Sequence, residues 1–415
     1  MLLNVMEKLI CEKTGLSFPI AADKLMSWQV GQIKAAALRA MSVNEFYKER
    51  FANCDIGAIQ DVRDMQRLPF TEQRELLEGS DNFLCVPAKM LSRITSLNTS
   101  GSTAKPKRIF FTDKDLLNTV NFFSERIVPV VGDGKRLLIM MSNSTYGSIA
   151  DLLKKGTEKS GIGAEIVGHV TDPALFASHI RAGDALVGLP SDIFALAKLY
   201  PNLRPSSVLL SADYAAKSLV DAVRESWQCR VYTHYGLTEV CFGCAVQCED
   251  RSFHHIRHED LFFEITDPNT GEILPYGAEG EVTVTVFGHE AMPLFRYRTG
   301  DISSLEIGAC PYCGSEMSRL GPVRGRVQNK IPLGDSYISI ERTDDIMYGM
   351  KGLISYKPKL EMSEQGARLN ILVQADSSFD VCSAAAKIKN AFPELADVKP
   401  ELTPHYNVLT GKRSL

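Results

Sequence analysis

The sequence predicts an α/β protein: a large N-terminal domain with parallel α/β sheets and a small β-barrel-like subdomain, followed by a small α+β C-terminal domain. Three observations predict this fold. Short apolar runs alternate with helical segments between residues 135 and 235, which is typical of β-α-β units and a parallel sheet. After residue 261, apolar and polar positions alternate, which indicates antiparallel strands. The length of 415 residues suits two or three domains.

The expected elements follow in chain order. Residues 1–90 have mainly helical patterns. Buried strands are predicted at 136–141, 185–190, 207–211 and 230–233, with helices at 192–200 and 215–228. Ser191 is the expected N-cap of the helix at 192–200. Antiparallel strands are predicted at 261–265 and 281–286, and the C-terminal unit adds a strand at 369–373 and a helix at 381–392. We place the domain boundary so that the domains are 1–326 and 327–415.

Composition and charge argue against several classes of function. Hydrophobic residues make up 45% of the chain and charged residues 23%, as in ordinary globular proteins. The net charge of −4 gives no reason to expect nucleic acid as a partner. No apolar run approaches the ~18 residues of a membrane span, and residues 1–10 resemble an amphipathic helix, not a signal peptide. We therefore expect a cytoplasmic protein without a membrane partner, whose 10 cysteines are reduced.

Four segments carry the chemistry, and their order is informative. They are residues 99–107 (TSGSTAKPK), 235–239 (YGLTE), 297–301 (YRTGD) and the pair Gly325-Arg326. The first segment is suited to a polyphosphate, because small residues admit backbone N–H groups and lysines supply charge. It is not a Walker A loop, since Lys105 is followed by proline. Taken alone, this segment is better explained as a surface turn before the strand at 108–111.

The ordered set resembles the adenylate-forming superfamily of acyl-CoA synthetases, peptide-synthetase adenylation domains and luciferases. The similarity is strongest to its phenylacetate-CoA ligase branch, through residues 45–47, 68–71 and 291–301. Two positions depart from the family pattern. Ala104 stands where the family usually has glycine, and Val327 follows Arg326 where an acidic residue is common.

The resemblance implies an ATP-dependent acid–thiol ligase. A small carboxylic acid, aryl or related, would attack the α-phosphate of ATP and give an acyl-adenylate, and coenzyme A would then displace AMP. ATP or AMP, Mg²⁺ and coenzyme A would be the ligands. Two alternatives remain open: transfer of the acyl group to a carrier protein or an amine, and a nucleotide-binding protein that has lost catalysis. The oligomeric state is also open, with a homodimer as one option.

The resemblance also assigns roles to single residues. The β- and γ-phosphates would be held by Ser100, Gly101, Ser102, Thr103 and Lys107. Tyr235, with Gly236 beside it, would stack on adenine. Thr238 would donate to the α-phosphate and Glu239 would bind Mg²⁺. Other nucleotide contacts would come from Ser211, Ala212, Asp213, Asp301 (ribose hydroxyls) and Arg326.

Lys412, in a terminal Gly-Lys pair, would bridge the attacking carboxylate and the α-phosphate. Without the resemblance, Lys412 would read as part of a frayed tail, and the loop carboxylates as solvated side chains. For the acyl pocket, Tyr146 and His234 are candidates, although simple packing would explain both equally well.

A second group of residues points to a metal. Cys310 and Cys313 form a C-x-x-C pair at a glycine turn, a common half-site for zinc. By resemblance to some members of the ligase branch, Cys248 and His255 would complete a closed, structural Cys₃His site. The rival ligands are Cys244, His254 and His258. Two free cysteines beside a turn are the alternative.

Overall fold

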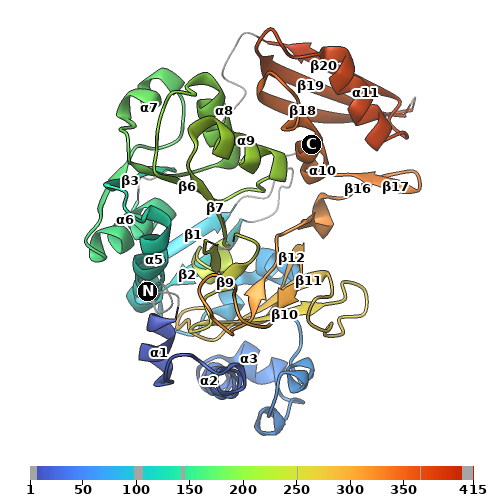
Figure 1. The fold of residues 1–415 in the computed structure, drawn as a ribbon. Coiled ribbons are helices and arrows are strands. Elements are labelled where there is room, and N and C mark those ends of the chain that lie inside the picture. Colours follow the sequence, from blue (N-terminus) through green and yellow to red (C-terminus); the bar gives the residue numbers. More distant parts are fainter. Residues whose placement is uncertain (1–6, 98–105, 142–144, 250, 365, 404–414) are drawn as a thin grey trace. The chain divides into compact units, whose positions relative to one another are not determined.

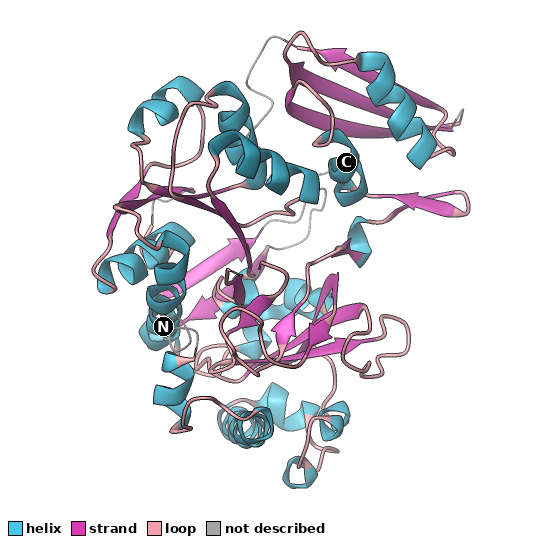
Figure 2. Cartoon of the chain, in the orientation of Figure 1, coloured by secondary structure: helices cyan, strands magenta, loops and turns pink. Residues whose placement is uncertain are grey.

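The computed structural model describes residues 7–97, 106–141, 145–249, 251–364, 366–403 and 415. Residue contacts divide the chain into two compact units. Unit 1 contains Met1–Pro129, Ser144–Gly161 and His234–Val323, and unit 2 contains Val130–Asn143, Ile162–Thr233 and Arg324–Leu415. The predicted boundary between domains 1–326 and 327–415 remains a prediction. Figures 1 and 2 show the elements of both units.

Unit 1 combines N-terminal helices with antiparallel strands. Its helices are α1 (Lys8–Thr14), α2 (Ala22–Val43), α3 (Glu45–Arg50), α4 (Gln73–Gly79), α6 (Ile149–Lys159) and most of α5 (Asp113–Val131). Short 3-10 turns lie at η1 (Ile56–Ala58), η2 (Arg63–Arg67), η3 (Ser80–Phe83), η4 (Ala88–Met90) and η5 (Thr238–Val240). The helical pattern predicted for the first 90 residues is thus a mixture of α-helices and 3-10 turns.

Two antiparallel arrangements in unit 1 position the candidate site. One sheet contains β10 (Leu261–Thr266), β11 (Gly280–Val286) and β12 (Leu294–Ser303). The other begins at His234 and Tyr235, the last two residues of β7 (Arg230–Tyr235), and continues through β8 (Ala245–Gln247), β9 (His254–Ile256), β14 (Arg319–Leu320) and β13 (Leu305–Glu306). A separate hairpin joins β1 (Arg93–Leu97) to β2 (Lys107–Phe111). The predicted antiparallel strands at 261–265 and 281–286 are confirmed.

The segments that carry the branch resemblance contact one another in unit 1. The Tyr47 hydroxyl of α3 donates to the Pro293 carbonyl just before β12. Thr71 pairs with Tyr297: its backbone N–H donates to Arg296 O at 3.1 Å, and its carbonyl accepts from Arg298 N at 3.0 Å. These contacts, together with the pairing of β12 to β11, hold the strand that carries YRTGD from both edges.

Unit 2 contains a parallel sheet in the order β4-β3-β5-β6-β7. Its strands and helices are β3 (Arg136–Met140), β4 (Gly163–Ile166), β5 (Ala185–Gly188), β6 (Ser207–Leu210), α7 (Pro173–His179), α8 (Pro190–Leu199) and α9 (Lys217–Trp227). The strands β5 and β6 are buried at every residue, as expected for parallel strands covered on both faces. Helix α9 buries Leu219, Val223 and Trp227, which are four residues apart and therefore share one face.

One detail of the predicted helix at 192–200 is wrong. Helix α8 begins at Pro190, and Leu189 is its N-cap residue, so Ser191 lies inside the helix. Proline is favoured at the first helical position, because the backbone N–H there has no partner within the helix and its absence in proline costs nothing. The local proline signal therefore outweighs the capping preference of serine.

The rest of unit 2 is α+β. It contains β15 (Gly325–Arg326), η6 (Val327–Asn329), β16 (Ile331–Leu333), β17 (Ser336–Ile338), α10 (Ile340–Met347), β18 (Leu353–Ser363), β19 (Gly366–Ala375), α11 (Val381–Ala391) and β20 (Asp397–Leu402). Strand β19 pairs antiparallel with β18 and parallel with β20. Leu369, Ile371 and Val373 alternate into the core of this part, as the sequence predicts for this strand.

Candidate functional site

Residues from three of the four predicted segments meet in unit 1. Lys107 begins β2, Glu239 lies in η5 directly after β7, and Tyr297 lies in β12. The Lys107 ammonium is ion-paired with Glu239 Oε1 and lies 3.3 Å from the Tyr297 hydroxyl oxygen. The Tyr297 hydroxyl donates to the same Oε1 at 2.7 Å. We call these three residues the Lys–Glu–Tyr cluster.

The Lys–Glu–Tyr cluster stabilises a buried negative charge. Glu239 is 7% exposed and Lys107 8%. Burial alone would raise the pKa of the Glu239 carboxyl, but the Lys107 charge and the hydrogen bonds from Lys107 and Tyr297 outweigh it, so this pKa lies below its usual value. Both contacts end on Oε1, so neither partner uses Oε2. A carboxylate oxygen of this kind is a ligand that Mg²⁺ accepts.

Two more of the predicted residues, from the YGLTE and YRTGD segments, form a hydrogen-bonded pair. The Tyr235 hydroxyl at the end of β7 donates to Asp301 Oδ2 in β12 at 2.7 Å, and both residues are buried. The turn that connects Tyr235 to η5, which carries Glu239, is tight. A Cβ on Gly236 would lie only 1.9 Å from the Phe242 carbonyl oxygen, so a larger residue does not fit without a backbone shift.

The remaining nucleotide-site predictions are distributed differently. Ser100, Gly101, Ser102, Thr103 and Lys412 lie outside the described residues. Unit 2 carries Ser211, Ala212, Asp213 and Arg326, and Thr238 opens η5 in unit 1. Ala212 has a left-handed backbone with φ +70, directly after Ser211, which follows β6. The structure therefore brings together Lys107 with Glu239, and Tyr235 with Asp301.

The two residues considered for the acyl pocket have very different environments. His234 is partly buried in β7, and desolvation of its imidazole lowers the pKa of the ring to about 3, so the ring is neutral near pH 7. Tyr146 is 56% exposed. Its hydroxyl donates to Asp113 Oδ1 at 2.9 Å, and the Lys155 ammonium lies 4.2 Å from its ring centroid.

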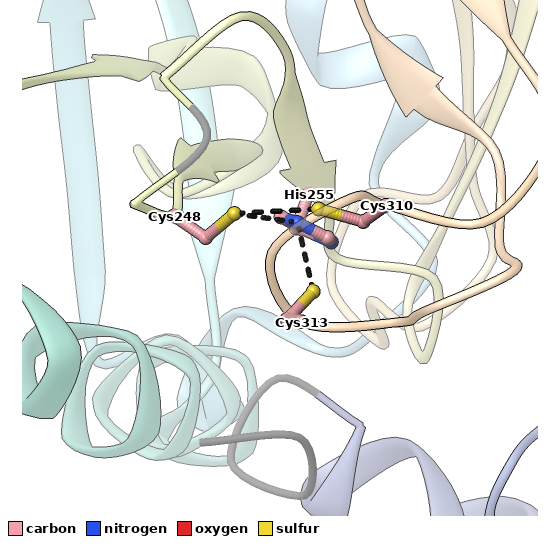
Figure 3. Close-up of side chains that lie close together, drawn as sticks. All are labelled: Cys248, His255, Cys310 and Cys313. Atoms are coloured by element: carbon pink, nitrogen blue, oxygen red, sulfur yellow. Dashed lines mark hydrogen bonds between the residues drawn. The ribbon is translucent and has the colours of Figure 1, made fainter. Parts of the chain in front are cut away.

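Cys248, His255, Cys310 and Cys313 form a compact cluster, which we call the Cys₃His cluster (Figure 3). Their potential ligand atoms all lie within 4.8 Å of one another, and all four residues are buried. His255 lies on β9 and pairs with Arg319 of β14. Strand β14 follows the Cys310–Cys313 turn in the chain by six residues. Gly314 closes that turn: its N–H donates to Cys310 O at 2.8 Å, and its φ is +70.

The distances in the Cys₃His cluster suit a tetrahedral ion. Cys248 Sγ lies 3.6 Å from Cys310 Sγ, and His255 Nε2 lies 3.3 Å and 3.5 Å from the sulfurs of Cys248 and Cys313. Zinc bonds of about 2.3 Å to sulfur and about 2.0 Å to nitrogen imply tetrahedral edges of roughly 3.5–3.8 Å. A disulfide between Cys248 and Cys310 would need a separation of about 2.05 Å, which this pair does not have.

Protonation in the Cys₃His cluster also favours metal ligation. A hydrogen bond with Cys248 and contacts with His255 lower the pKa of the Cys313 thiol to about 3. Burial would raise the pKa of Cys310, but the hydrogen bond with His255 and the backbone hydrogen bonds from Cys313 and Tyr312 together outweigh burial and lower that pKa. Thiolates are the form of cysteine that binds metals.

The rival ligands have other contacts. His254 Nδ1 lies 3.3 Å from Leu320 O, and His258 Nε2 lies 2.9 Å from Ser318 O. Neither residue, nor Cys244, belongs to the Cys₃His group found among the described residues. The four ligands expected from the resemblance are therefore the four that the structure gathers.

Sequence reasoning missed a role for Tyr297. The residue was visible as the first letter of YRTGD, but its contact with Lys107 spans 190 residues, so no local pattern could reveal it. Thr71, which pairs with Tyr297, was noticed only as part of the branch resemblance.

Among the residues that the structure describes, no helix has the length and apolarity needed to cross a membrane. No protein-family profile matches the chain. Sequence relatives exist nonetheless. Phenylacetate-coenzyme A ligase of Thermus thermophilus is 28% identical over 74% of this chain and 72% of its own length. The enzyme of the same name from Escherichia coli is 25% identical over 74% of this chain and 72% of its own length.

Solved structures share the fold. 2-Hydroxyisobutyryl-CoA ligase in complex with 2-HIB-AMP matches with a TM-score of 0.79 and 17% identity, over 95% of this chain and 89% of that one. The amide bond synthetase McbA from Marinactinospora thermotolerans matches with a TM-score of 0.53 and 19% identity, over 77% of this chain and 66% of that one.

The fold is that of the solved acyl-CoA ligase structures, and the ordered motifs resemble those of adenylate-forming enzymes. The sequence relatives are phenylacetate-coenzyme A ligases, so the chain is similar to this branch of the adenylate-forming superfamily, as the motifs predict.

Proposed function

We propose that this protein is an AMP-forming acid–thiol ligase. It activates a small carboxylic acid with ATP through an acyl-adenylate and then forms a thioester with coenzyme A. A substrate carboxylate oxygen bonds to the α-phosphorus while pyrophosphate leaves. The thiol sulfur then bonds to the acyl carbon, and AMP leaves. The phenylacetate-coenzyme A ligase relatives favour an aryl or related acid, and localisation in the cytoplasm remains a proposal.

One observation carries the proposal: segments predicted to hold one nucleotide meet through buried polar contacts. Lys107 and Glu239 are more than a hundred residues apart in the chain and form a buried ion pair. Tyr235 and Asp301, proposed for adenine and ribose, share a buried hydrogen bond. Burying charged groups is costly. Buried charged groups whose pKa values are shifted by specific partners are therefore candidates for a binding or catalytic role.

The proposed division of labour is electrostatic. Residues 100–103 and Lys107 offset the polyphosphate charge, so that a second anion, the carboxylate, can approach. Thr238 donates to the α-phosphate, and Lys412 bridges the two reacting groups. Arg326 and Asp213, which lie in unit 2, would add further nucleotide contacts. Mg²⁺, held by Glu239, would supply further charge neutralisation on the phosphates.

The Cys₃His cluster is proposed as a structural zinc site. Three thiolates and one imidazole fill all four tetrahedral positions, which leaves none for a substrate. Donor types, distances and lowered thiol pKa values support this assignment. Zinc would cross-link β9 to the Cys310–Cys313 turn, and its binding would release any protons still held by the thiols.

The acceptor is the main open choice. McbA, which shares the fold, is named an amide bond synthetase, so an amine or a carrier protein is the second candidate acceptor. A nucleotide-binding protein without catalysis is the third reading, suggested by Ala104 and by Val327 after Arg326.

ATP–pyrophosphate exchange over a panel of aryl and fatty acids tests the first half-reaction. We expect exchange with at least one acid and, on adding coenzyme A, a thioester of that acid. Exchange without thioester formation would move the proposal to a carrier or amine acceptor. No exchange with any acid would favour the protein without catalysis.

A further inference from the structure

The Tyr297 hydroxyl lies between the two charged groups of the proposed nucleotide site. It is 2.7 Å from Glu239 Oε1 and 3.3 Å from the Lys107 ammonium. An ammonium can only donate hydrogen bonds, so the Tyr297 oxygen accepts from Lys107 and its proton points to Glu239. The direction of both hydrogen bonds is therefore fixed by the chemistry of the three groups.

Tyr297 is held more firmly than the carboxylate that it contacts. It is 1% exposed, and its strand pairs with β11 through Val284 on one edge and with Thr71 on the other. The backbone pairing fixes the Cα position of Tyr297, and the packing around its buried ring restricts the side chain. This makes Tyr297 a rigid reference point within unit 1.

Glu239, in contrast, lies on a short turn. The 3-10 turn η5 spans only Thr238–Val240, and the next two residues, Cys241 and Phe242, have left-handed backbones with φ of +59 and +70. Left-handed conformations are costly for non-glycine residues and persist where the surroundings impose them. The orientation of the Glu239 side chain thus depends on contacts from other elements.

Lys107 alone is a weak anchor for this purpose, because its proposed ligand competes for it. The ammonium that pairs with Glu239 is also the group expected to bind polyphosphate. Tyr297 is neutral, and no nucleotide contact is proposed for its hydroxyl. The hydrogen bond from Tyr297 to Glu239 Oε1 can therefore persist when phosphate binds Lys107. This hydrogen bond does not involve Oε2.

We propose that Tyr297 is a positioning residue: its hydroxyl fixes the Glu239 carboxylate through Oε1 and reserves Oε2 for the divalent cation that accompanies ATP. This inference rests on the proposed function. Groups that orient a metal ligand in this way typically contribute about 10–100-fold to metal affinity.

The test compares Tyr297→Phe with a matched control, Tyr47→Phe. Tyr47 is also a fully buried tyrosine of unit 1, but its hydroxyl donates to the Pro293 carbonyl. The thermal stabilisation of each protein by ATP is measured as Mg²⁺ is titrated, which requires no turnover. We expect Y297F to raise the half-saturating Mg²⁺ concentration about 10–100-fold and Y47F to leave it unchanged.

The second arm uses Glu239→Gln. Because Tyr297 acts through Glu239, adding Y297F to E239Q should cause no further loss of Mg²⁺ dependence. Equal Mg²⁺ curves for Y297F and Y47F, or additive losses in the double variant, would overturn the positioning role while leaving the proposed function intact. An unfolded Y297F would also overturn it, because a hydroxyl that only orients a carboxylate is not required for folding. A wild type that ATP and Mg²⁺ do not stabilise would overturn both proposals.

Discussion

The two side-chain clusters of unit 1 hold charge in opposite ways. In the Cys₃His cluster the four potential ligand atoms lie within 4.8 Å of one another, and all four residues are buried. In the Lys–Glu–Tyr cluster two donors converge on one oxygen of Glu239, and the second oxygen is used by neither. A closed ligand set suits a structural ion, whereas a carboxylate with spare capacity suits a ligand that arrives and leaves. Breaking the Cys₃His cluster should therefore lower the stability of the protein. Breaking the Lys–Glu–Tyr cluster should instead lower its reaction rate or its affinity for ligands.

The largest effect is expected from Cys313→Ser. Losing one ligand leaves three, so we expect about one zinc per wild-type chain and almost none in the variant. The free energy of unfolding should fall by about 4 kcal/mol or more, the range associated with loss of a metal site. Elemental analysis and chemical denaturation measure the two quantities.

Cys244→Ser is the control for that prediction, since Cys244 is equally buried but lies outside the Cys₃His cluster. It should keep its zinc. A wild type without metal, and with the same stability as C313S, would show that the cluster is only a group of free thiols.

Lys412→Ala should lower the rate of adenylation without changing the free energy of unfolding, as expected for a residue that acts on a bound substrate. Removing the charge proposed between carboxylate and α-phosphate should slow adenylation about 10²–10³-fold, because this is the typical value of one preorganised electrostatic contact. Thioester formation from synthetic acyl-adenylate and coenzyme A should stay near the wild-type rate. Equal losses in both half-reactions, measured by rapid quench, would remove Lys412 from the adenylation step.

A smaller effect concerns acid stability beside the open cluster. His234 precedes Tyr235, and burial lowers the pKa of its imidazole to about 3, against about 6.5 in an unfolded chain. The unfolded state therefore takes up a proton first, and stability is lost as pH falls below about 6.5 towards 3. This residue should account for about 2 kcal/mol of the loss between pH 7 and pH 5.

His234→Gln should reduce that pH-dependent loss by about the same amount, even if its stability at pH 7 is lower. His179→Gln, a change at an exposed residue of α7, is the control and should keep the wild-type slope. Denaturation midpoints at several pH values measure it. Parallel curves for H234Q and wild type would mean that His234 is not the group responsible.

The sequence predicted the sheet elements more reliably than the contacts of the site. The buried runs at 136–141 and 207–211 are strands within one residue of β3 and β6, because parallel strands are apolar throughout. The four residues of the Cys₃His cluster could be predicted together because C-x-x-C is a local signal and the resemblance supplied the other pair. The contact between Tyr297 and Lys107 was not predicted, because it joins two strands that are 190 residues apart in the chain and no local pattern records it.

The smallest effect is expected from Tyr235→Phe, and it separates two uses of one side chain. The hydroxyl donates to Asp301 in the protein described here, and the ribose hydroxyls are proposed to donate to the same carboxylate. Phenylalanine keeps the ring for adenine, so the apparent KM for ATP should change by no more than about twofold, while the unfolding free energy falls by about 1–2 kcal/mol. Tyr235→Ala removes the ring as well, and loss of base stacking should raise that KM about tenfold, since stacking on an aromatic side chain contributes about 1–3 kcal/mol. If Y235F raised the KM as much as Y235A, the hydroxyl and not the ring would be the nucleotide contact, and the Tyr235–Asp301 pair would be part of the bound state instead of a contact that ribose replaces.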